Sequence, residues 1–368
     1  MLNIPKLGFG LMRLPSNNGE IDIEQFKRMV DIFMENGFTY FDTAWGYANG
    51  KSEEAAKIAL IDRYPREKFQ FATKLPAWMG VNTEEEAKEM FWTSLRRTGA
   101  GYFDFYLLHN LGDGREEYFD RFKIWDFAAE LKEKGLVKHV GFSFHDRADL
   151  LDKILTEHPE SEFVQLQINY ADWDDITVQS RKCLEVARAH GKPVVVMEPV
   201  KGGLLAKLPE EAAAILREAD HEASQASWAV RFAASQDNII TVLSGMSNIE
   251  QMENNVSFMR DFKPLTPEEY KVLDRVNEVL GKGRGVPCTD CRYCMKGCPM
   301  GIKIPHIFEA LNRAMIFNNI GSAKNSYNWE TKVGGKVEDC VECGACERVC
   351  PQHIAIRENL KKAAEMFK

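Results

Sequence analysis

Two runs of cysteines near one end of the chain constrain its structure more than any other feature. Residues 288–299 read CTDCRYCMKGCP and residues 340–351 read CVECGACERVCP, so both follow the pattern C-x2-C-x2-C-x3-C-P. Eight of the nine cysteines fall in these two runs. Cysteines clustered in this way are more often metal ligands than disulfide partners when a chain stays in a reducing compartment. We therefore expect the C-terminal part to fold around bound metal.

The spacing within the two runs predicts two [4Fe–4S] clusters. Cysteines three residues apart on a tight loop can reach three corners of a cubane, and the fourth, beyond that loop, is available to the other cluster. A structural zinc site is the alternative, but it usually takes two C-x2-C pairs. The predicted ligand sets are crossed. They are Cys288, Cys291, Cys294 and Cys350 for one cluster, and Cys340, Cys343, Cys346 and Cys298 for the other.

The first 280 residues alternate short apolar runs with amphipathic segments. Eight runs are almost continuously hydrophobic, as the strands of a buried parallel sheet are. They cover residues 6–11, 39–42, 70–74, 104–109, 138–143, 163–168, 193–198 and 239–244. Helical patterns fill the intervals, which predicts an α/β fold of the (β/α)8 TIM barrel type. An open doubly wound sheet is the alternative, and the lack of GxGxxG after an early strand argues against it.

Several helices have recognisable ends. The helix predicted at residues 23–36 is followed by Gly37 as a stop signal, and the one at 84–97 has Asn82 or Thr83 as a cap, with Glu86 placed for a capping box. The other helices are predicted at 115–134, 146–157, 176–190, 221–235, 266–280 and 305–319.

The segment GKGRG at residues 281–285 reads as a linker between two domains. The chain has 368 residues, whereas a single barrel needs about 250. We expect the barrel to occupy residues 1–280 and a small α-helical domain that carries the clusters to occupy residues 281–368. The ninth cysteine, Cys183, lies on a helical segment of the barrel and is predicted to be a buried thiol.

Charge and hydropathy exclude some classes of partner. The formal net charge is −8 and no run of basic residues stands out, which argues against a nucleic-acid partner. No apolar stretch approaches the roughly 20 residues that span a bilayer. The start of the chain, MLNIPKLGFG, lacks the pattern of a signal peptide. We therefore expect a cytoplasmic protein that binds neither nucleic acid nor a membrane.

Four titratable residues stand at the ends of successive predicted strands. Asp42 and Tyr47 lie in FDTAWGY after the second strand, Lys74 lies in FATKLP after the third, and His109 lies in FYLLHN after the fourth. Because the carboxyl ends of all strands in a parallel barrel share one face, where active sites lie, we expect the four side chains to converge.

This combination suits the donation of a proton to a carbonyl oxygen. A tyrosine phenol titrates near 10 when unperturbed, and the ammonium of Lys74 would lower the pKa of Tyr47. Asp42 would hold Lys74 charged and oriented. His109 would hydrogen-bond the substrate oxygen or relay a proton. The sequence thus predicts Tyr47 as the proton donor in the reduction of a carbonyl-type small molecule.

These four residues, in these contexts, resemble the catalytic tetrad of the aldo-keto reductases. The resemblance covers about residues 3–262 and includes GFGLMRLP, GYANGKSE and VLSGMSNIEQMENN. The C-terminal part resembles two-cluster ferredoxin domains with an inserted helix, so the whole chain looks like the ferredoxin-fused aldo-keto reductases of bacteria and archaea. The resemblance implies an oxidoreductase that uses NADPH or NADH and no catalytic metal.

The resemblance also implies a set of nucleotide contacts. Ser143 and Gln167 would bond the nicotinamide amide, and Gly202 and Gly203 would approach the pyrophosphate. The adenosine end would be held by Ser247, Gln251, Asn254 and Asn255. The alternative is that the glycines form an ordinary turn and the polar residues cap the following helix.

The identity of the cofactor stays open. Met197 stands where many members of the family place an aromatic residue against the nicotinamide. Residues 244–251 contain no Lys or Arg that would read a 2′-phosphate, so both NADP and NAD remain candidates. A flavin such as FMN at the same end of the barrel is a further alternative.

Three functions are compatible with these features. The chain is a nicotinamide-dependent reductase whose clusters exchange electrons with a redox partner protein, or an electron-transfer protein with a flavin in the barrel, or a reductase whose clusters are structural. The intact tetrad favours the first and the third.

Overall fold

The computed structural model describes residues 4–112, 114–176, 178–281, 285–288, 292–350 and 352–368. Contacts divide the chain into two compact units. Unit 1 contains the residues up to Lys201 together with Ala226–Leu265, and unit 2 contains Gly202–Gln225 and Thr266–Lys368. Residues 202–225, which we assigned to the barrel domain, are thus grouped with the C-terminal part, and the domain boundary at residue 280 stays a prediction.

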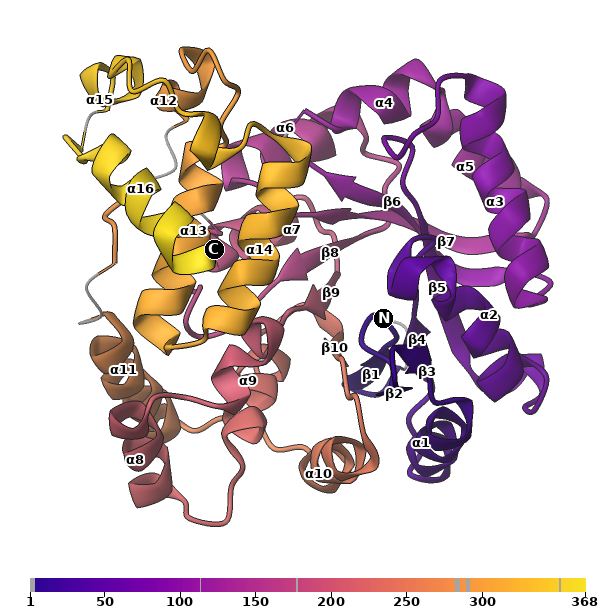
Figure 1. Cartoon of the computed structure of the whole chain (residues 1–368). Helices are drawn as coiled ribbons and strands as arrows, with labels where there is room; N and C mark the ends of the chain where they lie inside the picture. Colours follow the sequence, from indigo (N-terminus) through magenta and orange to yellow (C-terminus); the bar gives the residue numbers. More distant parts are fainter. Residues whose placement is uncertain (1–3, 113, 177, 282–284, 289–291, 351) are drawn as a thin grey trace. The chain divides into compact units, whose positions relative to one another are not determined.

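Eight parallel strands close into a barrel in unit 1 (Figure 1). Each predicted apolar run forms one strand, and β1 pairs with both β4 and β10 to close the sheet. The predicted TIM-barrel fold is therefore confirmed. In chain order the strands are β1 (Leu7–Gly10), β4 (Tyr40–Asp42), β5 (Gln70–Leu75), β6 (Phe103–Leu111), β7 (Val137–Phe144), β8 (Phe163–Gln167), β9 (Val194–Met197) and β10 (Ile239–Ser244). A short hairpin, β2 (Ser16–Asn17) and β3 (Glu20–Ile21), follows the first strand.

Helices surround the strands of unit 1 (Figure 1). They are α1 (Ile23–Glu35), α2 (Ser52–Ala56), α3 (Glu84–Thr98), α4 (Glu116–Arg121), α5 (Ile124–Glu133), α6 (Ala148–Glu157), α7 (Ser180–Ala189), α9 (Gln225–Ala234) and α10 (Ile249–Met259). Thr83 caps α3 by accepting from the Glu86 N–H at 3.2 Å, and the Glu86 carboxylate accepts from the Asn82 N–H at 2.7 Å. The single helix predicted at residues 115–134 is wrong, because Lys123 adopts a left-handed conformation (φ 48°) that separates α4 from α5.

The barrel interior changes from apolar to polar along the strands. Tyr40, Phe105 and Phe163 form an aromatic layer, with ring centroids 5.0 and 5.1 Å apart. Side chains that face the interior recur every second residue. The next inward positions on β4 and β8 are therefore Asp42 and Gln165, which lie toward the carboxyl ends of the strands.

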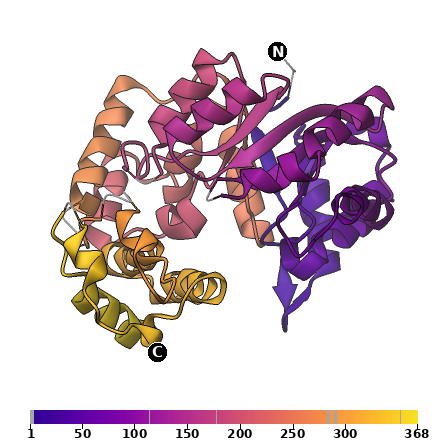
Figure 2. The same cartoon turned by 90° about the horizontal axis from the view of Figure 1, so that it is seen from above.

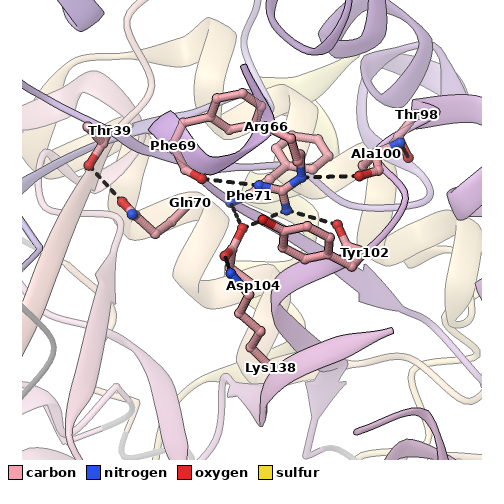
Figure 3. Close-up of polar contacts among 10 residues, drawn as sticks. All are labelled: Thr39, Arg66, Phe69, Gln70, Phe71, Thr98, Ala100, Tyr102, Asp104 and Lys138. Atoms are coloured by element: carbon pink, nitrogen blue, oxygen red, sulfur yellow. Dashed lines mark hydrogen bonds and ion pairs between the residues drawn. The ribbon is translucent and has the colours of Figure 1, made fainter. Parts of the chain in front are cut away.

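A saturated polar cluster stabilises the opposite ends of the strands (Figure 3). The Arg66 guanidinium donates to three backbone carbonyls, those of Phe69, Ala100 and Tyr102, at 2.8 to 3.1 Å, and to the Asp104 carboxylate at 2.6 Å. Lys138 donates to the other oxygen of Asp104 at 2.8 Å. We call Arg66, Asp104 and Lys138 the lower network.

Unit 2 is helical. In Figure 1, and in Figure 2 by its orange and yellow colours, the packed helices α13, α14 and α16 form its centre. Ile307, Leu311 and Leu360 belong to its buried core. The predicted helix at residues 305–319 corresponds to α13, with Pro305 in its first turn. The helices are α8 (Glu210–Ala219), α11 (Pro267–Gly281), α12 (Tyr293–Lys296), α13 (Ile304–Phe317), α14 (Ile320–Val333), α15 (Ala345–Arg348) and α16 (Ile356–Phe367).

Within the described ranges, no helix combines the length and the apolar character that crossing a membrane would need.

Candidate functional site

A buried ion pair lies at the carboxyl end of the barrel. Lys74, at the end of β5, donates its Nζ to Asp42 Oδ1 and, at 2.8 Å, to the carbonyl of Thr43. Gln165 of β8 donates to Asp42 Oδ2 at 3.0 Å from across the barrel. Asp42 is only 2% exposed and Lys74 only 1%. We call Asp42, Lys74 and Gln165 the upper network.

Tyr47 and His109 lie beside this pair. The chain after β4 turns into a 3-10 helix (Tyr47–Gly50), which brings the Tyr47 ring to 4.8 Å from Lys74 Nζ. The His109 ring meets Tyr47 edge-on, with centroids 5.9 Å apart. Trp78 Nε1 donates a hydrogen bond of 2.8 Å to the backbone carbonyl of His109. The four side chains predicted to converge therefore lie together, while their roles stay predictions.

The electrostatics differ from the sequence-based expectation in one respect. Burial raises the pKa of Tyr47 and outweighs the opposing attraction of Lys74, so the net shift is upward and not downward. Burial would lower the pKa of Lys74, but Asp42 and Tyr47 raise it above its ordinary value. Burial, helped by Lys74, His145 and Arg115, holds the pKa of His109 well below its ordinary range. At neutral pH the site thus has a protonated phenol, an ammonium and a neutral imidazole.

Two of the predicted nucleotide contacts stand at neighbouring strand ends. Ser143, at the end of β7, accepts from the Asn110 N–H at 2.8 Å. Gln167, at the end of β8, donates its Nε2 to Asp172 at 2.8 Å and pairs in register with Met197 of β9.

The predicted adenosine contacts lie at the start of α10 and along it. Asn255 donates to Ser244 at 3.3 Å, while its Oδ1 is buried without a hydrogen-bond partner among the described residues. Gln251 accepts from the Ser247 N–H at 2.8 Å, and Asn254 is half-buried. Ser247 and Gln251 therefore lie at the start of α10, where Asn248 is the cap, and Asn254 and Asn255 lie in the middle of the helix.

Gly202 and Gly203 belong to unit 2 and have left-handed backbones, with φ values of 64° and 95°. Glycine adopts this region without steric cost, which fits a turn that needs close backbone approach.

The cysteines of unit 2 line two cavities. One cavity is bordered by Cys288, Cys294 and Cys350. A second is bordered by Cys298, Cys340, Cys343 and Cys346. In each cavity, one cysteine from one sequence run joins the cysteines of the other run. This grouping is what crossed ligand sets require, and the donor set suits iron–sulfur ligation, while the ligand sets themselves stay a prediction. Cys291 lies outside the described residues.

Comparison with known proteins identifies both parts of the chain. Residues 6–278 match a family described as the aldo/keto reductase family. The chain belongs to this family. Residues 287–355 match a 4Fe-4S dicluster domain, so this aldo/keto reductase is an oxidoreductase fused to an iron–sulfur domain.

Relatives of this aldo/keto reductase match about three quarters of the chain. The uncharacterized oxidoreductase YqkF of Bacillus subtilis is 24% identical over 304 residues, which cover 74% of this chain and 92% of the relative. An aldo-keto reductase of Mycolicibacterium vanbaalenii is 28% identical over 280 residues, covering 75% and 89%.

Solved structures agree on the fold. The holo form of aldo-keto reductase AKR11C1 from Bacillus halodurans matches with a TM-score of 0.60 and 27% identity, covering 75% of this chain and 93% of that one. An aldo-keto reductase from Klebsiella pneumoniae in complex with NADPH matches with a TM-score of 0.57 and 22% identity, covering 74% and 91%.

Sequence reasoning missed three polar residues in this aldo/keto reductase. Gln165 was within reach of the argument, because it lies two residues before Gln167 and must share its inward face. Asp172, which is buried, and Lys201, which is partly exposed, form an ion pair in the loops after β8 and β9. No motif marks these two residues, which are distant in the sequence.

Proposed function

We propose that this chain reduces a carbonyl-type small molecule with NADPH or NADH, with Tyr47 as the proton donor. We further propose that its C-terminal part holds two [4Fe–4S] clusters that exchange electrons with a redox partner protein. The observation that carries the first proposal is the position of the Asp42–Lys74 ion pair against the Tyr47 ring, with His109 facing the same ring.

Residues of the chain can deliver the proton that the substrate oxygen needs. Tyr47 keeps its proton at neutral pH because a phenol ordinarily titrates near 10, and burial raises the pKa of Tyr47 further. The Lys74 ammonium, 4.8 Å from the ring, stabilises the negative charge that forms on Tyr47 as the proton leaves. Asp42 holds Lys74 in place and charged. His109 is neutral, so its ring can donate a hydrogen bond to the substrate oxygen without competing for the proton.

Several features support a nicotinamide nucleotide at this end of the barrel. When bound, the nucleotide supplies a hydride. The related structure from Klebsiella pneumoniae holds NADPH. The Oδ1 of Asn255, which has no partner in the described part of the chain, offers a buried acceptor for the adenosine end. Ser143 and Gln167 offer polar groups for the nicotinamide amide.

The crossed cysteine cavities support two clusters, which would each carry single electrons. We expect about eight irons per chain in protein purified without oxygen. The predicted ligands of the first cluster are Cys288, Cys291, Cys294 and Cys350, and those of the second are Cys340, Cys343, Cys346 and Cys298. A single zinc per chain would contradict this assignment.

A flavin is the proposed link between hydride transfer by a nicotinamide and one-electron transfer by the clusters. A nicotinamide transfers two electrons at once and a cluster transfers one, whereas a flavin accepts either. Reducing the clusters chemically in flavin-free protein, without nicotinamide, tests this. We expect no substrate turnover until FMN is added, and turnover without FMN would contradict the link.

The reductase proposal is tested with Tyr47→Phe. We expect the variant to bind NADPH or NADH with unchanged affinity and to lose reduction of a panel of aldehydes and ketones by about 10²- to 10⁴-fold. Full activity in Tyr47→Phe would overturn the role of Tyr47.

A further inference from the structure

A buried hydrogen-bond network surrounds Asp172, just beyond the end of β8. Asp172 is 2% exposed. Its Oδ2 accepts from Gln167 Nε2 at 2.8 Å and from Asn169 Nδ2 at 2.7 Å, and its Oδ1 accepts from Lys201 Nζ. Asn169 Oδ1 in turn accepts from the Asp172 N–H at 2.9 Å. The carboxylate is therefore held from several directions.

The same network joins two neighbouring loops. Asn169 also donates to the Glu198 carbonyl at 3.1 Å, and Lys201 lies three residues further on. Glu198 and Lys201 both have left-handed backbones, with φ values of 55° and 48°. Non-glycine residues adopt this region at a cost, so the surrounding contacts must hold the turn after β9 in place.

Asp172 acts only as an acceptor at neutral pH. Burial alone would raise its pKa, but Lys201, Asn169 and Gln167 lower it below its ordinary value. An ionised carboxylate has no proton to donate.

This fixes the orientation of the Gln167 amide. A glutamine can present either its NH₂ group or its oxygen to a neighbour, but only the NH₂ group satisfies a carboxylate. The Oε1 of Gln167 must therefore face away from Asp172. Gln167 is the last residue of β8 and shares its inward face with Gln165, so this oxygen is left for a partner other than Asp172.

Ser143 supplies the complementary group on the adjacent strand. Its Oγ accepts from the Asn110 N–H at 2.8 Å, which leaves its hydroxyl proton available for donation to another group. One donor on β7 and one acceptor on β8 match the carbonyl and the NH₂ group of a primary amide.

We propose that Asp172 and Lys201 are positioning residues that make Gln167 an obligate acceptor, so that the site selects a nicotinamide ring by the NH₂ group of its carboxamide. The proposal rests on the proposed function, because it assumes that the nucleotide binds at this end of the barrel.

The test compares each nucleotide with an analogue that differs only at the NH₂ group of the carboxamide. The 3-acetylpyridine analogues of NADH and NADPH keep the carbonyl oxygen and replace NH₂ with a methyl group. We expect the wild-type protein to bind the carboxamide forms about tenfold more tightly or better, measured by fluorescence titration and calorimetry, because the analogue leaves the Gln167 oxygen unpaired.

The decisive variant is Asp172→Asn/Lys201→Met, which removes the pair without leaving a lone buried charge. Because Asn accepts as well as donates, Gln167 can then turn either way, and we expect the preference to fall below about threefold. A merely structural role would weaken both nucleotides together and leave their ratio unchanged. If this variant does not fold, Asp172→Asn alone and Gln167→Leu are measured in the same way, and both should lose the preference.

A matched control is Glu162→Gln/Lys132→Met, which removes a carboxylate–lysine pair before β8, at the other end of the strand. It should keep the wild-type preference. An unchanged preference in the Asp172 and Gln167 variants overturns the proposal. Equal wild-type affinity for both forms also overturns it but leaves the proposed function standing, whereas a wild-type protein that binds none of the four nucleotides refutes the proposed function itself.

Discussion

The barrel carries a charged network at each end of its strands, and the two networks are built differently. In the lower network the Arg66 guanidinium donates hydrogen bonds to three backbone carbonyls and a carboxylate (Figure 3). In the upper network Lys74 and Asp42 bind each other, yet His109 Nδ1 beside them is buried without a partner among the described residues. A network whose polar groups are hydrogen-bonded to one another stabilises the fold. Buried polar atoms without a partner at the carboxyl ends of the strands indicate a ligand-binding site.

The largest effect is expected from removing the upper ion pair in Asp42→Leu/Lys74→Met. Activity should fall by about 10²- to 10⁴-fold, because Tyr47 loses the charge that stabilises its phenolate. The free energy of unfolding should stay within about 1 kcal/mol or rise, since apolar replacement of a buried ion pair is often neutral or stabilising. Reductase assays and urea unfolding check this. Substantial destabilisation would show that the upper pair supports the fold as the lower network does.

The opposite result is expected for Arg66→Met in the lower network. The substitution leaves the carbonyls of Phe69, Ala100 and Tyr102 without this donor, while Lys138 and the Phe71 N–H still donate to Asp104. The free energy of unfolding should fall by about 1–3 kcal/mol. The kcat/KM of the folded fraction should stay within about twofold of wild type, because none of these groups reaches the catalytic end. A large loss of kcat/KM in folded Arg66→Met protein would contradict the separation of the two ends.

A smaller effect is expected from acid, also at the lower end. Burial would raise the pKa of Glu162, but hydrogen bonds from His139, Lys132 and the Val140 N–H lower it to about 2. Because the folded-state value lies below the unfolded one, this group contributes stability above about pH 4.5 that is lost as pH falls toward 2. Glu162→Gln should remove part of the acid dependence of stability, as measured by urea unfolding at pH 3 and pH 7. Parallel pH curves for the two proteins would contradict the assignment.

The smallest effect is expected at the upper end, where pH near neutrality should change little. Reduction requires protonated Tyr47, whose pKa is raised, so activity from this group should decline only above about pH 10. The pKa of His109 is held well below its ordinary range, so its ring stays neutral. The kcat/KM for reduction should therefore be flat between about pH 6 and pH 8. A limb near pH 6.5 that disappears in His109→Gln would show that His109 titrates in this range.

The strands of the barrel and part of the upper end could be predicted from the sequence. Continuous apolar runs mark buried parallel strands, so all eight strands and the convergence of Tyr47, Lys74 and His109 were within reach. The cysteine spacing likewise predicted which cysteines share a cavity. The break at Lys123 was not predictable, because its left-handed conformation depends on how α4 and α5 pack and leaves no pattern in the sequence.

Electrostatic detail was harder to predict than geometry. The direction of the Tyr47 shift depends on the balance between burial and Lys74, and the extent of burial cannot be read from local sequence. Asp172 and Lys201 meet only because β8 and β9 are adjacent, and an isolated Asp in a loop is ordinarily a turn residue.

Cys298 and Cys340 border the same cavity, although α13 and α14 lie between them in the chain. Residues 299–339 therefore form an excursion of the chain, which begins and ends beside the same cavity. The helices of this excursion pack in the core of unit 2, so extra residues fit best in the exposed connection between them at Asn318 and Asn319. Each doubling of a loop's length costs only about 0.6 kcal/mol of closure entropy. This connection is consequently where a chain of this architecture can accept inserted segments over evolutionary time, while the thiols that border the cavity keep their places.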